Sequence, residues 1–349
     1  MDLNQRIDVF IKLGQHLATF IKLNNEGINK DEFNELNSTL NLAYIKNGWF
    51  TRDNALNMLD QIARQLNPES IGQWISRYDI QSRSPLNIGI IMAGNIPLVG
   101  FNDLFCVLMS GHTAVVKLSS DDEILPRYIL DYLVKQNPAI HNFIKVSDAR
   151  LKGIDAVIAT GSNNSARYFQ YYFGKYPNII RKNRHSVAVL KGTEDAGDLQ
   201  ALGSDIFTYF GLGCRSVSKL YVPFNYNFNL FFESIVQFGE VVNNKKYGNN
   251  YDYNRAVFLL NNEKFLDNNF LIVKEGLSIA TPVSVLHFEY YSDINELEEK
   301  LNREQDNLQC IVSKGAWFKN SLAFGNSQTP LLNDYADGID TMQFLLELK

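Results

Sequence analysis

The sequence predicts an α/β fold in which helices cover both faces of a parallel sheet. Residues 86–118 contain two short, densely apolar, β-rich runs separated by a helical stretch. Strands that are apolar along their whole length are typical of parallel sheets buried on both faces. Strand and helix patterns alternate through the remainder of the chain, which is the order expected of α/β proteins.

The first half of the chain is expected to form a doubly wound nucleotide-binding domain. It opens with an amphipathic helix, because Leu, Ile, Val and Phe recur at helical spacing in residues 1–23. Apolar runs and the Gly, Pro and Asn residues at their ends predict the elements that follow. These are a strand at 88–92, a turn at 93–97, a helix at 98–109, a strand at 113–118, a helix at 127–136, a strand at 156–160 and a helix after Ser162.

The second half, from about residue 184, also alternates between strand and helix patterns. Strands are predicted at 186–190, 217–222, 256–260 and 279–288, and helices at 196–210 and 228–238. The asparagine-rich residues 243–254 are interpreted as a long surface loop.

Composition argues against several kinds of partner. The 349 residues include 33 basic and 38 acidic side chains, and this net charge of -5 argues against binding to nucleic acid. The apolar residues 86–118 are interrupted by Asn95, Pro97 and His112, so they do not predict a membrane span. The first helix lacks the features of a secretory signal, and we expect a cytoplasmic protein.

The chain has three cysteines, too few for a disulfide framework, and they are expected to be reduced thiols. Cys106 and Cys310 lie in the apolar runs LFCVLM and LQCIVS, where cysteine usually behaves as a small buried hydrophobe. Both are predicted to be core residues. No histidine has a metal-ligand spacing to another histidine or to a cysteine, so no metal is predicted.

Cys214 has different surroundings, in the stretch YFGLGCRSVSKLYVP. Gly211 and Gly213 leave the backbone bare, which allows a ligand to approach closely. Arg215 and Lys219 add positive charge, which favours a thiolate. The stretch by itself fits a reactive thiolate and a buried cysteine at a glycine-rich bend equally well.

Small, polar or basic residues follow three of the predicted parallel strands, where α/β sheets bind their ligands. They are Ala93-Gly94-Asn95, Lys117-Leu118-Ser119 and Thr160-Gly161-Ser162. A helix start after Gly161 suits a phosphate, although this segment by itself favours an ordinary helix start with Ser162 or Asn163 as N-cap. No GxGxxG fingerprint follows the first strand, so a standard Rossmann dinucleotide mode is not supported.

Taken together, these segments resemble the aldehyde dehydrogenase superfamily, specifically its fatty acyl-CoA reductase branch known from bacterial bioluminescence. The resemblance covers roughly residues 85–345 and rests on segments that follow one another in the family's order. They are NIGIIMAGNIPLVG, TAVVKLSS, ATGSNNSAR, RHSVAVL, YFGLGCRSVSKLYVP, SIATPVSVLHF and TPLLNDYADGIDTMQFL.

The resemblance implies a fold and a set of site residues. The fold is aldehyde dehydrogenase-like, with N-terminal helices and a nucleotide-binding domain at 1–183, a thiol-bearing catalytic domain at 184–320, and a segment at 321–349 that returns to the cofactor domain or to an oligomer interface. Cys214 would be the nucleophile, Asn95 an oxyanion-hole donor and Lys117 the ribose-facing lysine. Without the resemblance, Asn95 would be interpreted as a turn residue. The remaining cofactor-binding candidates are Ser119, Ser120, Thr160, Gly161 and Ser162.

The chain departs from the family pattern at three places. Residues 181–186, RKNRHS, replace the segment whose glutamate activates water in the hydrolytic enzymes. Ser278 replaces a glutamate that contacts the nicotinamide ribose. Ser120 replaces the acidic residue that excludes a 2′-phosphate, which favours NADPH over NADH, although Asp121 and Asp122 beside it weaken the argument. The basic residues of the 181–185 run are interpreted as phosphate ligands or as a solvated face.

The resemblance predicts a cytoplasmic, NADPH-dependent enzyme that reduces an acyl-CoA or another fatty acyl thioester to an aldehyde through an acyl-cysteine. The alternatives are a short-chain acylating aldehyde dehydrogenase that uses NAD, and a degenerate scaffold for an acyl-activating partner enzyme. A homo-oligomer is expected, without nucleic acid or a membrane span.

Overall fold

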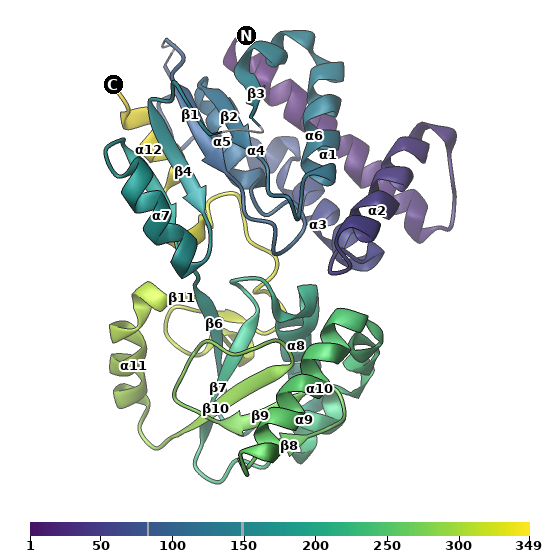
Figure 1. Ribbon diagram of the computed structural model, residues 1–349, viewed down its shortest axis with the longest axis vertical. Helices are drawn as coiled ribbons and strands as arrows, with labels where there is room; N and C mark the ends of the chain where they lie inside the picture. Colours follow the sequence, from purple (N-terminus) through teal and green to yellow (C-terminus); the bar gives the residue numbers. More distant parts are fainter. Residues whose placement is uncertain (82–83, 148–149) are drawn as a thin grey trace. The chain divides into compact units, whose positions relative to one another are not determined.

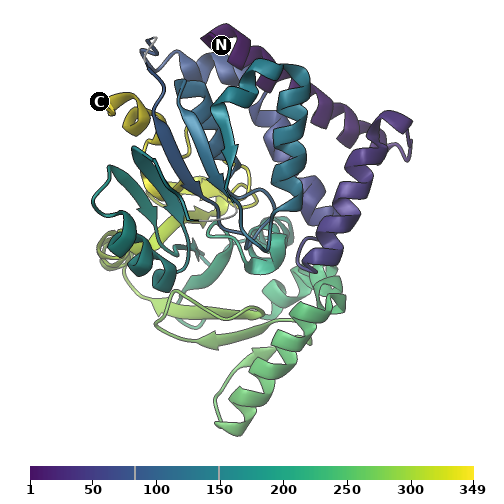
Figure 2. The same cartoon turned by 45° about the horizontal axis from the view of Figure 1, so that its top comes forward.

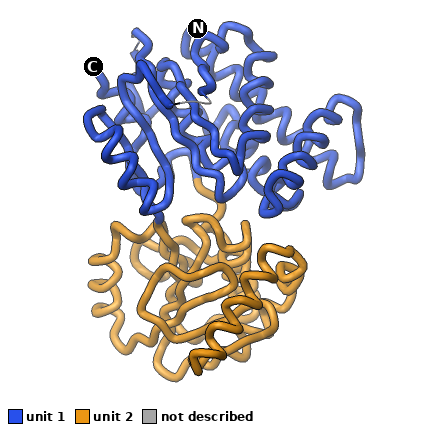
Figure 3. Tube along the Cα trace, viewed as in Figure 1, with its two compact units in different colours: residues 1–183, 331–349 blue, residues 184–330 orange. Residues whose placement is uncertain are grey.

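The chain, described by a computed structural model over residues 1–81, 84–147 and 150–349, divides into two compact units (Figure 3). Unit 1 comprises residues 1–183 and 331–349, and unit 2 comprises residues 184–330. Each unit has its own sheet and its own apolar core.

Within its described residues, unit 1 holds a five-stranded sheet in the order β3-β2-β1-β4-β5 (Figure 1). Every pairing in this sheet is parallel. The order changes direction between the neighbours β1 and β4, which is the switch point where doubly wound sheets bind ligands. The strands are β1 (Asn87–Ile91), β2 (Thr113–Lys117), β3 (Ile144–Val146), β4 (Ala156–Thr160) and β5 (Asn178–Arg181).

Helices cover both faces of this sheet. Successive strand side chains point to opposite faces, and each face contributes to a different apolar cluster. Ile88 and Ile90 belong to the main core, which also contains residues of α1, α5, α6 and α12, whose bounds are given below. Val115 and Val157 belong to a smaller cluster with Phe169 of α7. The helices are α1 (Leu3–Asn25), α2 (Asn34–Lys46), α3 (Arg52–Gln65), α4 (Pro68–Ile75), α5 (Phe101–Ser110), α6 (Ile124–Gln136), α7 (Asn163–Phe173) and α12 (Thr341–Glu347). Short 3-10 helices occupy Asp31–Phe33, Pro138–Phe143 and Ala336–Gly338.

The C-terminal residues 331–349 are tied into unit 1 by side-chain hydrogen bonds. The Trp74 indole N–H donates to the Tyr335 hydroxyl at 2.7 Å, and the Tyr78 hydroxyl donates to the Asp340 carboxylate at 2.9 Å. Nδ1 of the fully buried His112 accepts from the Leu86 N–H, so its Nε2 donates to the Leu345 carbonyl at 3.0 Å. These partners lie far apart in the sequence, so the last helix is part of the unit 1 core.

Unit 2, all of whose residues are described, holds a seven-stranded sheet in the order β12-β11-β6-β7-β10-β9-β8. Only the edge pair β8 and β9 is antiparallel. The strands are β6 (His185–Val189), β7 (Val217–Pro223), β8 (Leu266–Asp267), β9 (Ile272–Glu275), β10 (Val285–Tyr291), β11 (Leu308–Ser313) and β12 (Ser321–Ala323). The helices are α8 (Ala196–Phe207), α9 (Asn229–Ser234), α10 (Lys245–Leu260) and α11 (Ile294–Arg303), with 3-10 turns at Thr208–Gly211, Val236–Asn243, Gln305–Asn307 and Lys314–Ala316.

Most elements predicted for the first half are confirmed. The strand at 156–160 has the predicted bounds, Gly111 ends α5 with a left-handed φ of 87°, and Ser162 caps α7. The helix predicted to begin at Leu98 begins three residues later, at Phe101, because Leu98 has a left-handed φ of 53°. The α/β fold class is confirmed in both units.

Two predictions for the second half are wrong, and one helix explains both. Most of the supposed surface loop at 243–254 and all of the supposed strand at 256–260 belong to α10 (Lys245–Leu260), drawn in green in Figure 2 as one continuous helix. The Asn244 side chain caps its first turn by accepting from the Lys246 N–H at 3.0 Å. Tyr247 and Tyr251 are buried, so packing overrides the polar composition of this segment.

The strand predicted at 279–288 is only partly correct, since β10 begins at Val285. Ser284 has a left-handed φ of 68°, which interrupts an extended run. Two helices also end earlier than predicted, α8 at Phe207 and α9 at Ser234, each followed by a 3-10 segment. In the described part of the chain, no helix is both long and apolar enough to cross a bilayer.

Candidate functional site

The carboxyl ends of three unit 1 strands meet at one edge of the sheet. Ile91, the last residue of β1, is paired with Lys117 of β2 and with Ala159 of β4. Three candidate residues therefore lie at or just after the ends of neighbouring strands. They are Asn95 in the turn after β1, Lys117 at the end of β2 and Thr160 at the end of β4. Asn95 is exposed, and Lys117 and Thr160 are half-buried.

The turns after β1 and β2 touch each other at Gly94. A Cβ at this position would lie 2.5 Å from the Ser119 Oγ, so no other residue fits without displacing the second turn. Ser119 accepts the Asp121 N–H at 3.2 Å, while the Ser120 and Asp121 side chains are exposed. Gly94 and Ser119 thus form one contact surface between the two turns.

Asp122 is buried, whereas its neighbours Ser120 and Asp121 are exposed. Its side chain is 4% exposed, and its Oδ2 accepts the Leu98 N–H at 2.6 Å. Burial raises the pKa of this carboxyl to about 7, against the opposing effect of the hydrogen bond. Asp122 is therefore not the exposed carboxylate that its position beside Ser120 suggested, because its side chain has an internal partner.

The N-terminus of α7 follows β4 directly. The Ser162 Oγ accepts the Ser165 N–H at 3.2 Å, so the hydroxyl is used as an N-cap. A Cβ on Gly161 would lie 2.8 Å from the Ser165 Cβ, so glycine is required for the close turn into the helix. Ser162 is exposed, and the positive end of the helix dipole at this point favours an anion.

Arg181 is not a surface phosphate ligand, which corrects one interpretation of the basic run. It is 3% exposed, and its guanidinium contacts the Asp103 carboxylate at 2.6 Å and the Thr341 hydroxyl at 2.8 Å. The Asp103 charge raises the pKa of Arg181 against the lowering effect of burial. Arg184 donates to the Leu308 carbonyl at 3.0 Å, and Lys182 is exposed. Arg181 therefore joins β5 to α5 and α12 inside unit 1, whereas Arg184 makes its hydrogen bond within unit 2.

Cys214 lies in unit 2, half-buried, between α8 and β7. The backbone that leads to it has three successive left-handed residues, Tyr209 with φ 55°, Phe210 with φ 56° and Gly211 with φ 75°. A left-handed conformation costs a non-glycine residue about 1–3 kcal/mol, and such strain concentrates at functional sites. Gly211 alone was visible in the sequence as a position able to adopt it.

The peptide of Cys214 is held by Ser186. The Ser186 Oγ donates to the Cys214 carbonyl at 2.9 Å and lies 3.0 Å from the Cys310 Sγ. A hydroxyl has one proton, so the Cys310 thiol is the donor in the second contact. Burial raises the pKa of Cys310 to about 11, which keeps this thiol protonated. The pairing of β6 with β7 shifts register at Ser186, as strands often do beside active sites.

The core prediction holds for Cys106 and needs correction for Cys310. Cys106 is fully buried, and burial raises its pKa well above the usual value. Cys310 packs against the main core of unit 2 but is only half-buried, and its thiol contacts Ser186. Among the described residues no cysteine forms a disulfide.

Lys219 does not provide the free positive charge that the sequence suggested. It is completely buried, and its Nζ contacts the Glu289 carboxylate at 2.6 Å and donates to the Leu277 carbonyl at 2.7 Å. Burial lowers the pKa of Lys219, and the Glu289 contact opposes this shift. Arg215 donates to the Ser327 carbonyl at 3.4 Å.

Ser278, which by the sequence resemblance replaces a ribose-binding glutamate, is exposed in unit 2. Its carbonyl accepts from Nδ1 of His287 at 2.9 Å, and its hydroxyl donates to the Ala280 carbonyl at 2.9 Å. Burial lowers the pKa of His287, so the imidazole is neutral near pH 7. This segment is held by hydrogen bonds and carries no carboxylate at position 278.

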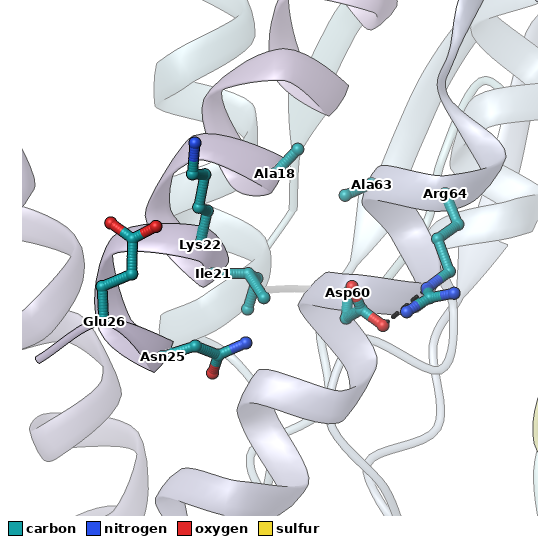
Figure 4. Close-up of a pocket in the computed structure, with 8 residues that line it drawn as sticks. All are labelled: Ala18, Ile21, Lys22, Asn25, Glu26, Asp60, Ala63 and Arg64. Carbon is teal, nitrogen blue, oxygen red and sulfur yellow. Dashed lines mark hydrogen bonds and ion pairs between the residues drawn. The ribbon is translucent and has the colours of Figure 1, made fainter.

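The described residues contain no cluster of three or more histidine, cysteine, aspartate or glutamate side chains arranged for a metal ion. An open pocket of about 470 Å³ lies on unit 1 between α1 and α3 (Figure 4). Its charged lining includes the Arg64–Asp60 ion pair, at 2.7 Å, and Lys22 and Glu26. None of the residues predicted for the site lines this pocket.

Sequence reasoning missed two residues that hold the candidate segments, Asp122 and Ser186. Neither has a local signal, because each acts through a backbone group distant in the sequence, Leu98 and Cys214 respectively. The order of the strands brings Ser186 beside β7, and that pairing could have been anticipated from the α/β alternation.

Comparisons with known proteins find similarity at the level of structure. No family model and no curated protein sequence matches the chain. Aldehyde dehydrogenase 21 from Physcomitrella patens, solved with succinate, superimposes with a TM-score of 0.67 at 13% identity, covering 99% of this chain and 84% of that one. An NAD-dependent benzaldehyde dehydrogenase from Corynebacterium glutamicum gives 0.65 at 13% identity, covering 90% and 76%.

A third similar structure is a mutant of aldehyde dehydrogenase C from Pseudomonas syringae, in complex with NAD+ and octanal. It has a TM-score of 0.64 at 12% identity and covers 90% of this chain and 73% of that one. In each case the similarity extends over both units of the chain, because at least 90% of its residues are covered. The chain therefore has the aldehyde dehydrogenase fold.

Proposed function

We propose that the chain is an NADPH-dependent reductase of fatty acyl thioesters, acyl-CoA in particular, and that it releases an aldehyde. The observation that carries the proposal is the setting of Cys214. This half-buried residue follows a strained left-handed segment, and its backbone carbonyl accepts a hydrogen bond from the Ser186 hydroxyl. A fixed, accessible cysteine is what covalent catalysis on a thioester requires.

Cys214 would act as the nucleophile. Its thiolate attacks the thioester carbonyl carbon, and the carbonyl electrons move to the oxygen. When they return, the bond to the coenzyme A sulfur breaks, coenzyme A leaves as a thiolate, and the acyl group stays on Cys214. Exchange of one thioester for another is nearly isoenergetic, so the acyl group can be held until hydride arrives.

The oxyanion formed during this attack needs donors that are already in place. The backbone N–H of Cys214 would supply one, and the side-chain amide of Asn95 the other. Asn95 is exposed at the carboxyl edge of the unit 1 sheet, as a side chain that meets substrate must be. Removal of one such donor lowers turnover by about 100–1,000-fold in enzymes where it has been measured.

The carboxyl edge of the unit 1 sheet fits a nicotinamide cofactor. Gly94 adds no side chain where the turns after β1 and β2 meet, and Lys117 and the N-terminus of α7 offer positive charge to phosphates. Lys117, Ser119, Ser120, Thr160, Gly161 and Ser162 would hold the cofactor. When bound, a reduced nicotinamide supplies the hydride that converts the acyl carbon to the aldehyde.

The preference for NADPH is proposed from Ser120. This side chain is exposed where the family's acidic residue excludes a 2′-phosphate. Asp122, one of the two neighbouring carboxylates that weakened the argument, is buried against Leu98. Asp121 is exposed and is the remaining source of repulsion.

An acyl-enzyme that waits for hydride must avoid hydrolysis. Arg181 stands in the segment that carries the water-activating glutamate in hydrolytic relatives, and it is buried in an ion pair. A carboxylate base is therefore missing at this position of the chain. This favours reduction over aldehyde oxidation to a free acid.

Mass spectrometry after mixing the protein with acyl-CoA chains of graded length, without cofactor, tests the proposal. A single acyl adduct on Cys214 is expected, together with aldehyde formation once NADPH is added. Cys214→Ala and Cys214→Ser should form no adduct, and Cys106→Ala is the matched control. An adduct on Cys310 in the wild type, or turnover by Cys214→Ala, would overturn the assignment, and the longest chain that reacts separates a fatty acyl from a short-chain substrate.

A further inference from the structure

The turn that carries Asn95 contains a strained residue held by one buried carboxylate. Leu98 has a left-handed φ of 53°, a conformation that a branched apolar side chain adopts only under constraint. Its N–H donates to the Asp122 Oδ2 at 2.6 Å. The two residues are separated by 24 positions in the chain, so the constraint comes from the turn after the next strand.

Asp122 is poorly suited to a role in stability alone. Its side chain is 4% exposed, and its second oxygen, Oδ1, is buried without a hydrogen-bond partner. A buried carboxylate that satisfies only one oxygen opposes folding whenever it is ionised. Retaining it requires a benefit other than stability, and the hydrogen bond that its side chain accepts comes from the turn that carries Asn95.

The surrounding contacts give this carboxylate a fixed position. The Asp122 N–H donates to the Ser119 carbonyl at 3.2 Å and closes the turn after β2. Ser119 is the residue against which Gly94 packs. The buried Asn47 donates to the Asp121 carbonyl at 3.2 Å and anchors the same turn to the helical layer. The turn after β1 is thus supported at two points, Gly94 and Leu98, that lie on either side of Asn95.

We propose that Asp122 is a positioning residue that fixes the turn at residues 93–98 and thereby the orientation of the Asn95 amide. It touches neither substrate nor cofactor and acts through the Leu98 N–H. The part of this inference that concerns catalysis rests on the proposed acyl transfer to Cys214. The part that concerns the turn stands independently of it.

Hydrogen exchange of residues 93–100 tests the effect on the turn. Asp122→Ala removes the acceptor, and exchange in this segment should become about tenfold faster, as expected for loss of one buried hydrogen bond. Asp122→Asn keeps an acceptor and should be intermediate. Asp121→Ala removes an exposed carboxylate from the adjacent position and should exchange at the wild-type rate. Equal exchange in wild type and Asp122→Ala would overturn the proposal.

Two reactions of Cys214 test the link to Asn95. Acylation by acyl-CoA passes through an oxyanion, whereas alkylation by iodoacetamide does not. Asp122→Ala should lower the acylation rate by about 10–100-fold, the range expected when a catalytic group is displaced, and should leave the alkylation rate unchanged. Asp122→Asn should recover part of the acylation rate, and Asp121→Ala should match the wild type in both reactions.

The outcomes separate this inference from the proposed function. Faster exchange in Asp122→Ala without any loss of acylation would overturn the link to Asn95. Equal losses of acylation and alkylation would indicate general damage to the protein and would overturn it as well. If wild-type Cys214 is not acylated, the proposed function fails, and the exchange comparison still decides whether Asp122 fixes the turn.

Discussion

The energetic cost of Asp122 can be measured through pH. Its pKa is raised from 3.8 to about 7, mainly by burial, so the folded chain binds this proton more tightly than the unfolded chain does. The stability that follows is fully present below pH 3.8 and is lost as the pH rises to about 7. The shift of about three pH units corresponds to a loss of about 4 kcal/mol over the full range.

The Asp122→Asn variant has no ionisable group at position 122, so it serves as the reference for the pH dependence of the wild type. Between pH 5 and pH 8 the wild type should lose about 3 kcal/mol relative to the variant, since about two pH units of the shift fall in this window. The exposed Asp121 and the Glu123–Lys46 ion pair are present in both proteins, so their contributions to stability cancel in the difference. The unfolding free energy of the wild type minus that of the variant should thus be about 3 kcal/mol lower at pH 8 than at pH 5.

Urea unfolding followed by tryptophan fluorescence provides the measurement. Trp49 and Trp74 belong to unit 1, while Trp317 belongs to unit 2. A Trp317→Phe background therefore makes the fluorescence report the unit that contains Asp122. A difference in unfolding free energy that stays constant from pH 5 to pH 8 would refute the reasoning, because it would mean that the pKa of Asp122 is not raised by folding.

Further substitutions test other features of the chain. Arg181→Met leaves the Asp103 carboxylate buried without its partner and should destabilise unit 1 by about 3–5 kcal/mol, measured by urea unfolding in the Trp317→Phe background. Unchanged stability together with weakened cofactor binding would instead support a phosphate-binding role for Arg181. Asn244→Ala removes the N-cap of α10 and should cost about 1 kcal/mol, which chemical denaturation followed by Trp317 can detect; no loss would mean that packing alone fixes the helix start. Ser120→Glu should shift the ratio of kcat/KM towards NADH through repulsion of a 2′-phosphate; an unchanged ratio would mean that this position does not contact the ribose.

The parts of the fold that sequence predicts best are those with a local cause. The strand at 156–160 is a short apolar run bounded by a polar turn, and its bounds were predicted correctly. Ser162 was predicted as an N-cap candidate because a serine preceded a helical run, and its hydroxyl caps α7. In both cases the residues that determine the element lie within a few positions of it.

The errors occur where a distant contact determines the backbone. Leu98 was assigned to a helix from its apolar neighbours, but the hydrogen bond to Asp122 accompanies a left-handed conformation there. The α10 segment was misjudged because its asparagines suggested a loop and its last residues a strand. A helical signal was present, since Tyr247, Tyr251 and Asn254, the buried residues of α10, recur at intervals of four and three.

The two candidate site segments share a physical arrangement that residue types alone could not reveal. Asn95 lies three residues before the left-handed Leu98, and Cys214 lies three residues after the left-handed Gly211. Each segment is held by a side chain from another part of its own unit, the Asp122 carboxylate on the Leu98 N–H and the Ser186 hydroxyl on the Cys214 carbonyl. Backbone strain persists only where surrounding contacts enforce it. The sequence could identify the Asn95 amide and the Cys214 thiol as candidates, whereas the contacts that hold their segments depend on strand pairing. A substitution at Asp122 or Ser186 removes such a contact and leaves the candidate side chain in place, so it separates the effect of the contact from that of the side chain.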